Sequence, residues 1–255
     1  MLIVMLISAF GIGGSASAAG TVVVTPAHTQ GWTSTDMRAG GSVSYIVDAS
    51  SPYPDGALKL TTDGNNASKA NYMHGASGSL QSVTELGYWT KQNSGASEAA
   101  ASYQLPVDLD GGDLSTGFTY FVYEPYWNGT VVPGTWQSWD VDAGQFWSSR
   151  SFTAGTCSVT SGAGGPPFYT LAGLQAACPA AIVLGFGVNV GTYNLNYDVE
   201  VDGVNFNGTT YDFELTNTPT SKDDCKTGGW QTFTDGQNNP FKNQGDCIQF
   251  VNTGK

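Results

Sequence analysis

From position 20 onward the chain is a succession of short runs rich in β-branched and aromatic residues, separated by turn-forming breakers. The runs include SVSYIVD, GFTYFVYEPYW, AAIVLGFGVNV and YDVEVDGVNFN, and the breakers include SSPYPDG, TDGNN, DGGD and NG. Such runs between Gly, Pro, Asn and Asp clusters are typical of strands and turns. About ten strands with almost no helical periodicity predict an all-β domain. The many Gly, Thr and Asn residues favour a β-sandwich.

Two local signals are specific enough to place single elements. Asn207-Gly208 lies between two β-rich runs, and this dipeptide is the strongest hairpin signal in the chain. The stretch YTLAGLQAACP predicts a short helix that Thr170 caps and that ends before Pro179.

The first residues predict export. An apolar run from Leu2 to Ile12 leads into the small residues SASAAG, which is typical of a signal peptide, here residues 1–19. No later apolar run approaches the roughly 20 residues of a membrane span, so we expect a secreted protein without a transmembrane anchor. A net charge of −12 with only 12% charged residues argues against nucleic acid or an anionic membrane as partner.

Four cysteines agree with an extracellular location. Cys157, Cys178, Cys225 and Cys247 allow three disulfide connectivities; adjacent pairing is the simplest, and the sequence does not choose among them. The segment 20–215 is predicted to be the β-sandwich domain. Residues 216–255 are predicted to be a small extension whose miniature core is formed by Trp230, Phe233 and Phe241, since so small a unit needs a disulfide to be stable.

Three stretches carry a resemblance to known proteins. The run FVYEPYWNGTVVPGTWQSWDVDAGQFWSS resembles bacterial secreted proteins of uncharacterised function. The run VDGVNFNGTTYDFE resembles the last hairpin of secreted jelly-roll domains, an architecture shared by lectins, many carbohydrate-binding modules and some glycanases. The tail from Cys225 onward is similar to short tails that end other bacterial exported proteins. The resemblance implies an exported jelly-roll sandwich with a Cys-paired tail and implies no reaction.

The first of these stretches is also rich in tryptophan. If Trp136 and Trp139 share a strand, they point to opposite faces, and Trp139 lies on the same face as Val141 and is expected in the core. Trp136 and Trp127 are then the candidates for stacking on sugar rings, with Glu124, Tyr126 and Asp140 as hydrogen-bonding partners of sugar hydroxyls. Ordinary packing of all these rings is the alternative reading.

Carboxylate pairs are the candidates for catalysis. Glu124 lies among aromatic residues, where its pKa would rise, and Asp140 is its candidate partner. A second set is Asp198, Glu200 and Asp202, which alternate along one predicted strand with Val199 and Val201 facing the core. Residues i and i+4 of a strand are about 13 Å apart, whereas a retaining glycosidase needs carboxyls about 5–5.5 Å apart. An i and i+2 pair could suit an inverting mechanism, and Glu200 is the catalytic candidate of this strand.

One acidic turn is the candidate for a metal ion. Asp108, Asp110 and Asp113 flank two glycines, and clustered carboxylates of this kind can bind Ca²⁺. A plain hairpin turn explains the same residues. No cofactor is certain, and calcium is the candidate that we retain.

Three hypotheses for function follow. The first is a secreted carbohydrate-binding or cell-surface protein without catalysis, whose partner is a polysaccharide. The second is a secreted polysaccharide-degrading enzyme, a hydrolase or lyase, that uses a carboxylate pair. The third is a structural matrix protein. The sequence indicates neither the glycan nor the oligomeric state.

Overall fold

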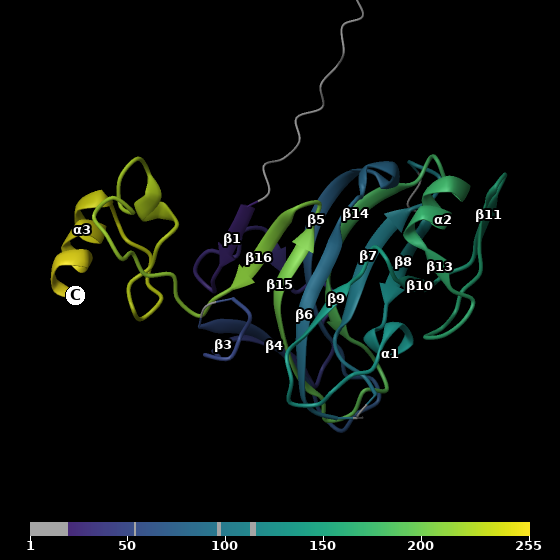
Figure 1. Cartoon of the computed structure of the whole chain (residues 1–255), viewed down its shortest axis with the longest axis horizontal. Helices are drawn as coiled ribbons and strands as arrows, with labels where there is room; N and C mark the ends of the chain where they lie inside the picture. The colour runs from purple at the N-terminus through teal and green to yellow at the C-terminus, as the bar shows by residue number, and fades with distance from the viewer. Residues whose placement is uncertain (1–19, 54, 96–97, 113–115) are drawn as a thin grey trace, which may run out of the picture.

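Two β-sheets packed face to face form the body of the protein (Figure 1). A computed structural model describes residues 20–53, 55–95, 98–112 and 116–255, so the expected signal peptide lies outside the described residues. Each sheet has seven strands, and one continuous apolar core lies between them. The all-β prediction is confirmed: the chain is a β-sandwich of jelly-roll type.

Sheet A is organised around its central strand β15, which pairs with β16, β4 and β6. Val199 and Val201 of β15 are fully buried in the core, as their alternation with acids predicts. The strands of sheet A are β1 (Gly20–Val24), β3 (Gly41–Val47), β4 (Gly56–Thr62), β6 (Leu86–Ser94), β9 (Gln137–Asp140), β15 (Asp198–Phe206) and β16 (Thr209–Phe213).

Sheet B has the order β13-β10-β8-β7-β14-β5-β2. Tyr103, Leu105 and Val107 of its central strand β7 point into the core, because alternate residues of a strand lie on opposite faces. The strands of sheet B are β2 (Trp32–Thr33), β5 (Ala70–Ser79), β7 (Ser102–Asp108), β8 (Phe118–Tyr123), β10 (Gln145–Ser148), β13 (Tyr169–Thr170) and β14 (Ile182–Val190).

The remaining elements are short. The described residues form sixteen strands, more than the ten or so expected, because several have only two or three residues, too few to show alternation. Two of these short strands, β11 (Phe152–Ala154) and β12 (Cys157–Val159), form a separate hairpin. The helices are α1 (Pro125–Asn128), α2 (Leu171–Ala177) and α3 (Gln244–Thr253). Single 3₁₀ turns lie at Leu80–Ser82 and Gly229–Gln231. Within the described residues no helix is long and apolar enough to span a bilayer.

The local predictions are confirmed. Asn207 and Gly208 both have positive φ and connect β15 to β16, as a two-residue hairpin turn of this type requires. Thr170 caps α2 through a hydrogen bond that its Oγ1 accepts from Gly173 N at 3.1 Å. A disulfide joins Cys157 to Cys178 at the end of this helix, and a second joins Cys225 to Cys247.

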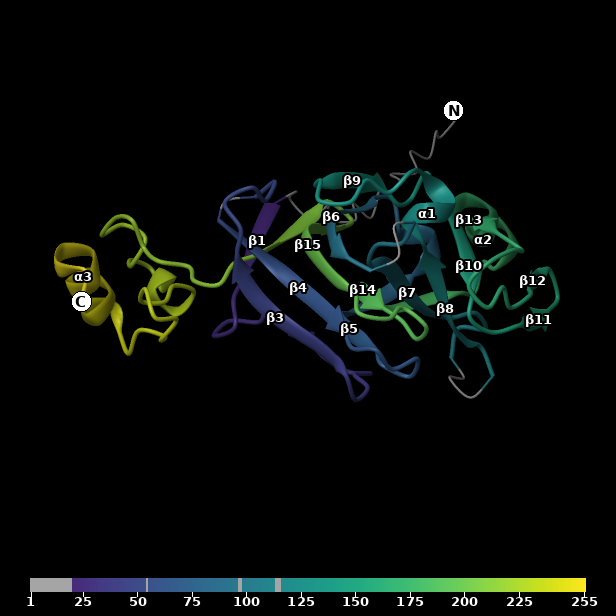
Figure 2. The same ribbon diagram turned by 90° about the horizontal axis from the view of Figure 1, so that it is seen from below.

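The residues after β16 have a hydrophobic cluster of their own. Cys225, Phe241 and Cys247 are buried in it, and Trp230 and Phe233 pack against them. Figure 1 and Figure 2 both place this segment, which ends in α3, at the opposite end of the molecule from the β11–β12 hairpin. The sequence predicts the aromatic members of this cluster but not the helix.

This separation gives a first testable prediction, that the extension can be unfolded while the sandwich stays folded. A Cys225→Ser/Cys247→Ser double variant should lose about 3 kcal/mol of local stability, the chain-entropy contribution of a loop of this length. We expect limited proteolysis to remove residues after about 216, while the urea midpoint of the sandwich is unchanged. A lower urea midpoint for the sandwich would show that the two parts fold as one unit.

Candidate functional site

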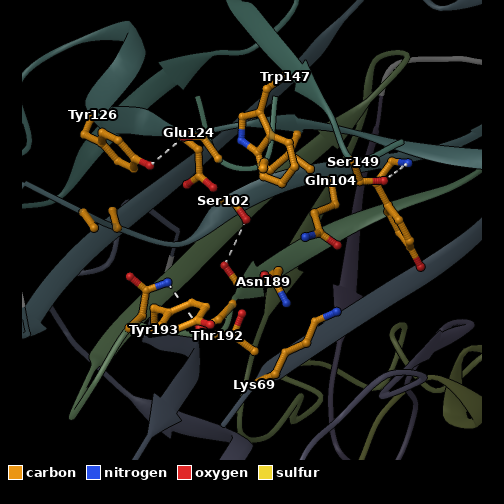
Figure 3. Close-up of a pocket in the computed structure, with 18 of the residues that line it drawn as sticks. Lys69, Ser102, Gln104, Glu124, Tyr126, Trp147, Ser149, Asn189, Thr192 and Tyr193 are labelled. Atoms are coloured by element: carbon orange, nitrogen blue, oxygen red, sulfur yellow. Dashed lines mark hydrogen bonds between the residues drawn. The ribbon is translucent and has the colours of Figure 1, made fainter. Parts of the chain in front are cut away.

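A pocket of about 560 Å³ lies on the outer face of sheet B. Its floor comes from the residues of β7 that point away from the core, Ser102 and Gln104, and from Tyr120 and Val122 of β8. Asn189 of β14 and Trp147 of β10 extend this floor on either side. Because alternate strand residues face the same side, four neighbouring strands bring these side chains into one pocket (Figure 3).

Loops raise the walls of the pocket. Tyr126 of α1 and the loop at Gly164 meet on one side, where the Tyr126 hydroxyl donates to Gly164 O at 3.3 Å and Trp127 Nε1 donates to the same oxygen at 2.8 Å. Tyr193 lies in the turn between β14 and β15 and is 79% exposed. Its φ of 69° is uncommon for a residue with a side chain, and backbone strain of this kind concentrates at functional sites.

Two buried polar atoms in the pocket lack hydrogen-bond partners among the described residues. They are Gln104 Oε1 and Trp147 Nε1, an acceptor and a donor. Buried polar atoms are nearly always hydrogen-bonded, to protein, water or a ligand. The pocket therefore offers both kinds of hydrogen bond beside aromatic rings.

Glu124 follows β8 and is the one carboxylic acid among the described residues that line the pocket. Burial raises the pKa of Glu124 to about 8. The indole N–H of Trp147 approaches the carboxyl and limits this increase in the pKa, although it does not reach good hydrogen-bond geometry. At neutral pH the Glu124 carboxyl is therefore largely protonated, so it can donate as well as accept.

The structure divides the ligand residues expected from the sequence between different surfaces. Glu124 and Tyr126 line the pocket, and Trp127 is next to it, 45% exposed with its ring 5.2 Å from that of Phe168. Asp140 lies instead in a separate shallow hollow with Glu85 and Asn205.

Trp136 lies on the outer face of sheet A, on the other side of the sandwich. Its Nε1 donates to Asp48 Oδ2 at 3.1 Å, and Lys91 Nζ is 5.2 Å from its ring centre. Trp139 is 8% exposed and donates to Thr90 Oγ1 at 2.8 Å, so its expected place in the core is confirmed. The opposite orientations of Trp136 and Trp139 agree with their spacing, but they put Trp136 far from the pocket in the fold.

The alternating acids of β15 are engaged in contacts within the protein. Asp198 pairs with Lys59 at 2.5 Å and Glu200 with Lys91 at 2.6 Å. Asp202 is fully buried and accepts from Ser51 Oγ at 2.6 Å and from two backbone amides. Burial raises the pKa of Glu200, and its hydrogen bond from Lys91 opposes this shift. Asp198 and Glu200 thus form an ion-paired surface on the outer face of sheet A.

Part of the acidic turn proposed for calcium is described. Asp108 is fully buried, and burial next to Asp110 raises its pKa. Asp110 Oδ2 accepts from Thr116 Oγ1 at 2.6 Å, and Asp113 lies outside the described residues. Among the side chains that are described, no three His, Cys, Asp or Glu residues are arranged to hold a metal ion.

Several pocket residues were not anticipated from the sequence, above all Gln104, Asn189 and Tyr193. Only Gln104 carried a usable signal, because it alternates with the apolar residues of the run ASYQLPVDL. The same run could have shown that this strand presents polar side chains on its outer face.

No family model matches the chain, and no curated protein matches it. Among solved structures it is similar to the family 11 carbohydrate-binding module of a cellulosomal cellulase of Clostridium thermocellum, with 13% identity over 78% of this chain and 95% of that chain, and a TM-score of 0.40. A family 11 module from Clostridium thermocellum in complex with a β-1,3-1,4-mixed-linked tetrasaccharide gives 12% identity over 72% and 91%, with a TM-score of 0.39. At these TM-scores the fold assignment rests on the two sheets themselves.

Proposed function

We propose that the pocket on the outer face of sheet B binds a carbohydrate chain and that the protein is an exported carbohydrate-binding protein without catalysis. The observation that carries this proposal is the combination of aromatic rings with polar atoms that lack protein partners. Trp147, Tyr126 and Tyr193 offer flat apolar surfaces to sugar rings. Gln104 offers a carbonyl oxygen without a protein partner to a sugar hydroxyl, as specific small-ligand sites do. Ser102 and Asn189 beside it donate to Asn189 O and Ala70 O and keep oxygens that can accept.

The acid content of the pocket favours binding over glycoside hydrolysis. Most glycosidases need two carboxyl groups that flank the bond to be cleaved. Of the described residues that line the pocket only Glu124 is an acid, and Asp36 at its edge is paired with Lys69. The other acids proposed from the sequence, Asp140 and Glu200, lie in a separate hollow and on the outer face of sheet A.

The proposed export is supported by the two disulfides. Both bonds use all four cysteines of the chain, and disulfides persist mainly in oxidising compartments. The apolar N-terminal run adds to this support.

The test is binding of the oxidised protein to a panel of insoluble and soluble polysaccharides, with the supernatant assayed for new reducing ends. We expect retention on at least one polymer without new reducing ends. Trp147→Ala should weaken binding at least tenfold, about 1.4 kcal/mol, because central aromatic residues dominate binding sites.

Trp136→Ala is the matched control, since it removes the same side chain from the outer face of sheet A. It should leave the affinity unchanged. Equal losses from both variants would place binding elsewhere, and new reducing ends that disappear in Glu124→Gln would favour an enzyme. Absence of both retention and product would leave the matrix protein as the remaining hypothesis.

A further inference from the structure

Two cationic side chains lie side by side at one edge of the pocket. Arg38 and Lys69 face each other across an isolated antiparallel bridge, in which Arg38 N donates to Lys69 O at 3.0 Å. Directly opposed residues of an antiparallel pair have their side chains on the same face, and both of these line the pocket. Like charges in this arrangement are unfavourable unless an anion lies between them.

Among the described residues, the one anion paired with these two cations is Asp36. Lys69 Nζ forms an ion pair with Asp36 Oδ2, and the side chain of Lys69 is 12% exposed. Arg38 contacts the same carboxylate only through Nε, at 4.0 Å, and its side chain is 51% exposed. Among the described residues its guanidinium has no hydrogen bond, so its two terminal nitrogens are available to a ligand.

The charge balance of the pocket differs from that of the whole chain. The protein has a net charge of −12 and only nine lysines and arginines, of which two line this pocket. Burial raises the pKa of Glu124, across the pocket from Lys69 in Figure 3, so it contributes little negative charge at neutral pH. Two cations and one shared carboxylate therefore leave the Arg38 edge positive, on an otherwise acidic protein.

We propose that the carbohydrate bound in this pocket is acidic, and that Arg38, supported by Lys69, binds the carboxylate of a uronic acid unit. This inference rests on the proposed function and adds the class of sugar. A guanidinium presents planar N–H donors that match both oxygens of a carboxylate, and such charge-assisted pairs are among the stronger hydrogen bonds. A neutral sugar would leave the exposed nitrogens of Arg38 without a charged partner.

The test compares each ligand with its own uncharged form. The probes are oligosaccharides of polygalacturonate, alginate and glucuronoxylan, each before and after chemical reduction of its carboxyl groups to hydroxymethyl groups, measured by calorimetry. We expect at least one acidic probe to bind about tenfold or more tightly than its reduced form, since hydrogen bonds to charged groups are the stronger kind. Added salt should weaken that binding.

Arg38→Gln should abolish the preference for the carboxylate while binding of the reduced probe is retained. Lys222→Gln is the control, because it removes the same charge from an exposed position in the C-terminal extension. Circular dichroism checks that both variants are folded, as expected for exposed side chains.

The outcomes separate this inference from the proposed function. Binding of neutral probes with no preference for carboxylates, or an unchanged preference in Arg38→Gln, would overturn the acidic ligand and leave carbohydrate binding intact. No binding of any acidic, reduced or neutral polysaccharide would overturn both.

Discussion

Trp32→Ala is expected to lower the free energy of unfolding by about 3–5 kcal/mol, the usual cost of truncating a large buried aromatic residue. Trp32 is 1% exposed although its strand, β2, has only two residues at the edge of sheet B. Its ring is 5.0 Å from that of Phe213 in sheet A and 5.4 Å from that of Phe186 in sheet B. The loss would therefore open a cavity between the two sheets.

Trp32→Phe separates ring packing from the indole N–H. Trp32 Nε1 is buried and has no hydrogen-bond partner among the described residues, so phenylalanine removes an unsatisfied donor while it keeps an aromatic ring. We expect a loss of less than about 1.5 kcal/mol, as for tolerated hydrophobic exchanges.

Urea unfolding followed by far-UV circular dichroism measures these differences. Trp127→Ala is the control, because this ring is 45% exposed; it should lower the free energy of unfolding by only about 1 kcal/mol, the net contribution of its hydrogen bond to Gly164 O. A Trp32→Ala variant as stable as Trp127→Ala would show that the edge of the sandwich tolerates a cavity or is not closed by this ring.

Local sequence signals were sufficient for most of the fold. Alternation showed that Val199 and Val201 face the core, and the Asn207-Gly208 dipeptide placed the last hairpin. These features depend on neighbouring residues of one strand or turn, which the sequence shows directly. Pro106 runs against such signals, because it lies in the central strand β7 although a proline cannot donate a hydrogen bond to the sheet. The neighbouring strand β14 shifts register between Val183 and Gly187, next to Pro106, and prolines within sheets are found at such irregularities.

The candidate site was harder to predict because its residues come from segments that are distant in sequence. Trp136 and Trp147 are near each other in the sequence, yet β9 joins sheet A and β10 joins sheet B. Residues 141–144 carry the chain from one sheet to the other, so two tryptophans of one stretch reach opposite faces of the sandwich. Spacing fixes the faces within a strand, but it does not tell which sheet the next strand joins.

The cationic edge of the pocket shows the same limitation. Arg38 and Lys69 are brought together by an isolated bridge between two irregular segments, which has no local pattern to reveal it. The composition of the chain also gives no indication of this cationic edge, because a net charge of −12 suggests an acidic surface throughout. A local excess of cations becomes visible only when the pocket is assembled.

Glu214→Gln is expected to make the protein more stable than the wild type at alkaline pH, with little difference at pH 5. Burial, and then the charge of the neighbouring Asp212, raise the pKa of Glu214 to about 9 from an ordinary value of 4.5. Asp212 is 6% exposed, and neither its Oδ1 nor Glu214 Oε1 has a hydrogen-bond partner among the described residues. Burial also raises the pKa of Asp212, to about 6, so the pair favours one bound proton at neutral pH.

The sign of the pH dependence follows from this raised pKa. Between pH 4.5 and 9 the folded protein keeps a proton on Glu214 that the unfolded chain releases, so stability falls as the pH rises through this window. The slope for one such proton is at most about 1.4 kcal/mol per pH unit. Glutamine has no proton to lose, and the variant should show a flatter curve.

Thermal unfolding of both proteins between pH 5 and pH 9 measures the difference. Comparison with the wild type cancels the groups that titrate alike in both, and leaves the joint contribution of Glu214 and its neighbour Asp212. Glu85→Gln, at an exposed position, is the control and should follow the wild-type curve. Parallel curves for wild type and Glu214→Gln would mean that Glu214 is ionised in the folded protein at neutral pH. In that case solvent must reach the Asp212–Glu214 pair, and the end of β16 must be more open than this packing indicates.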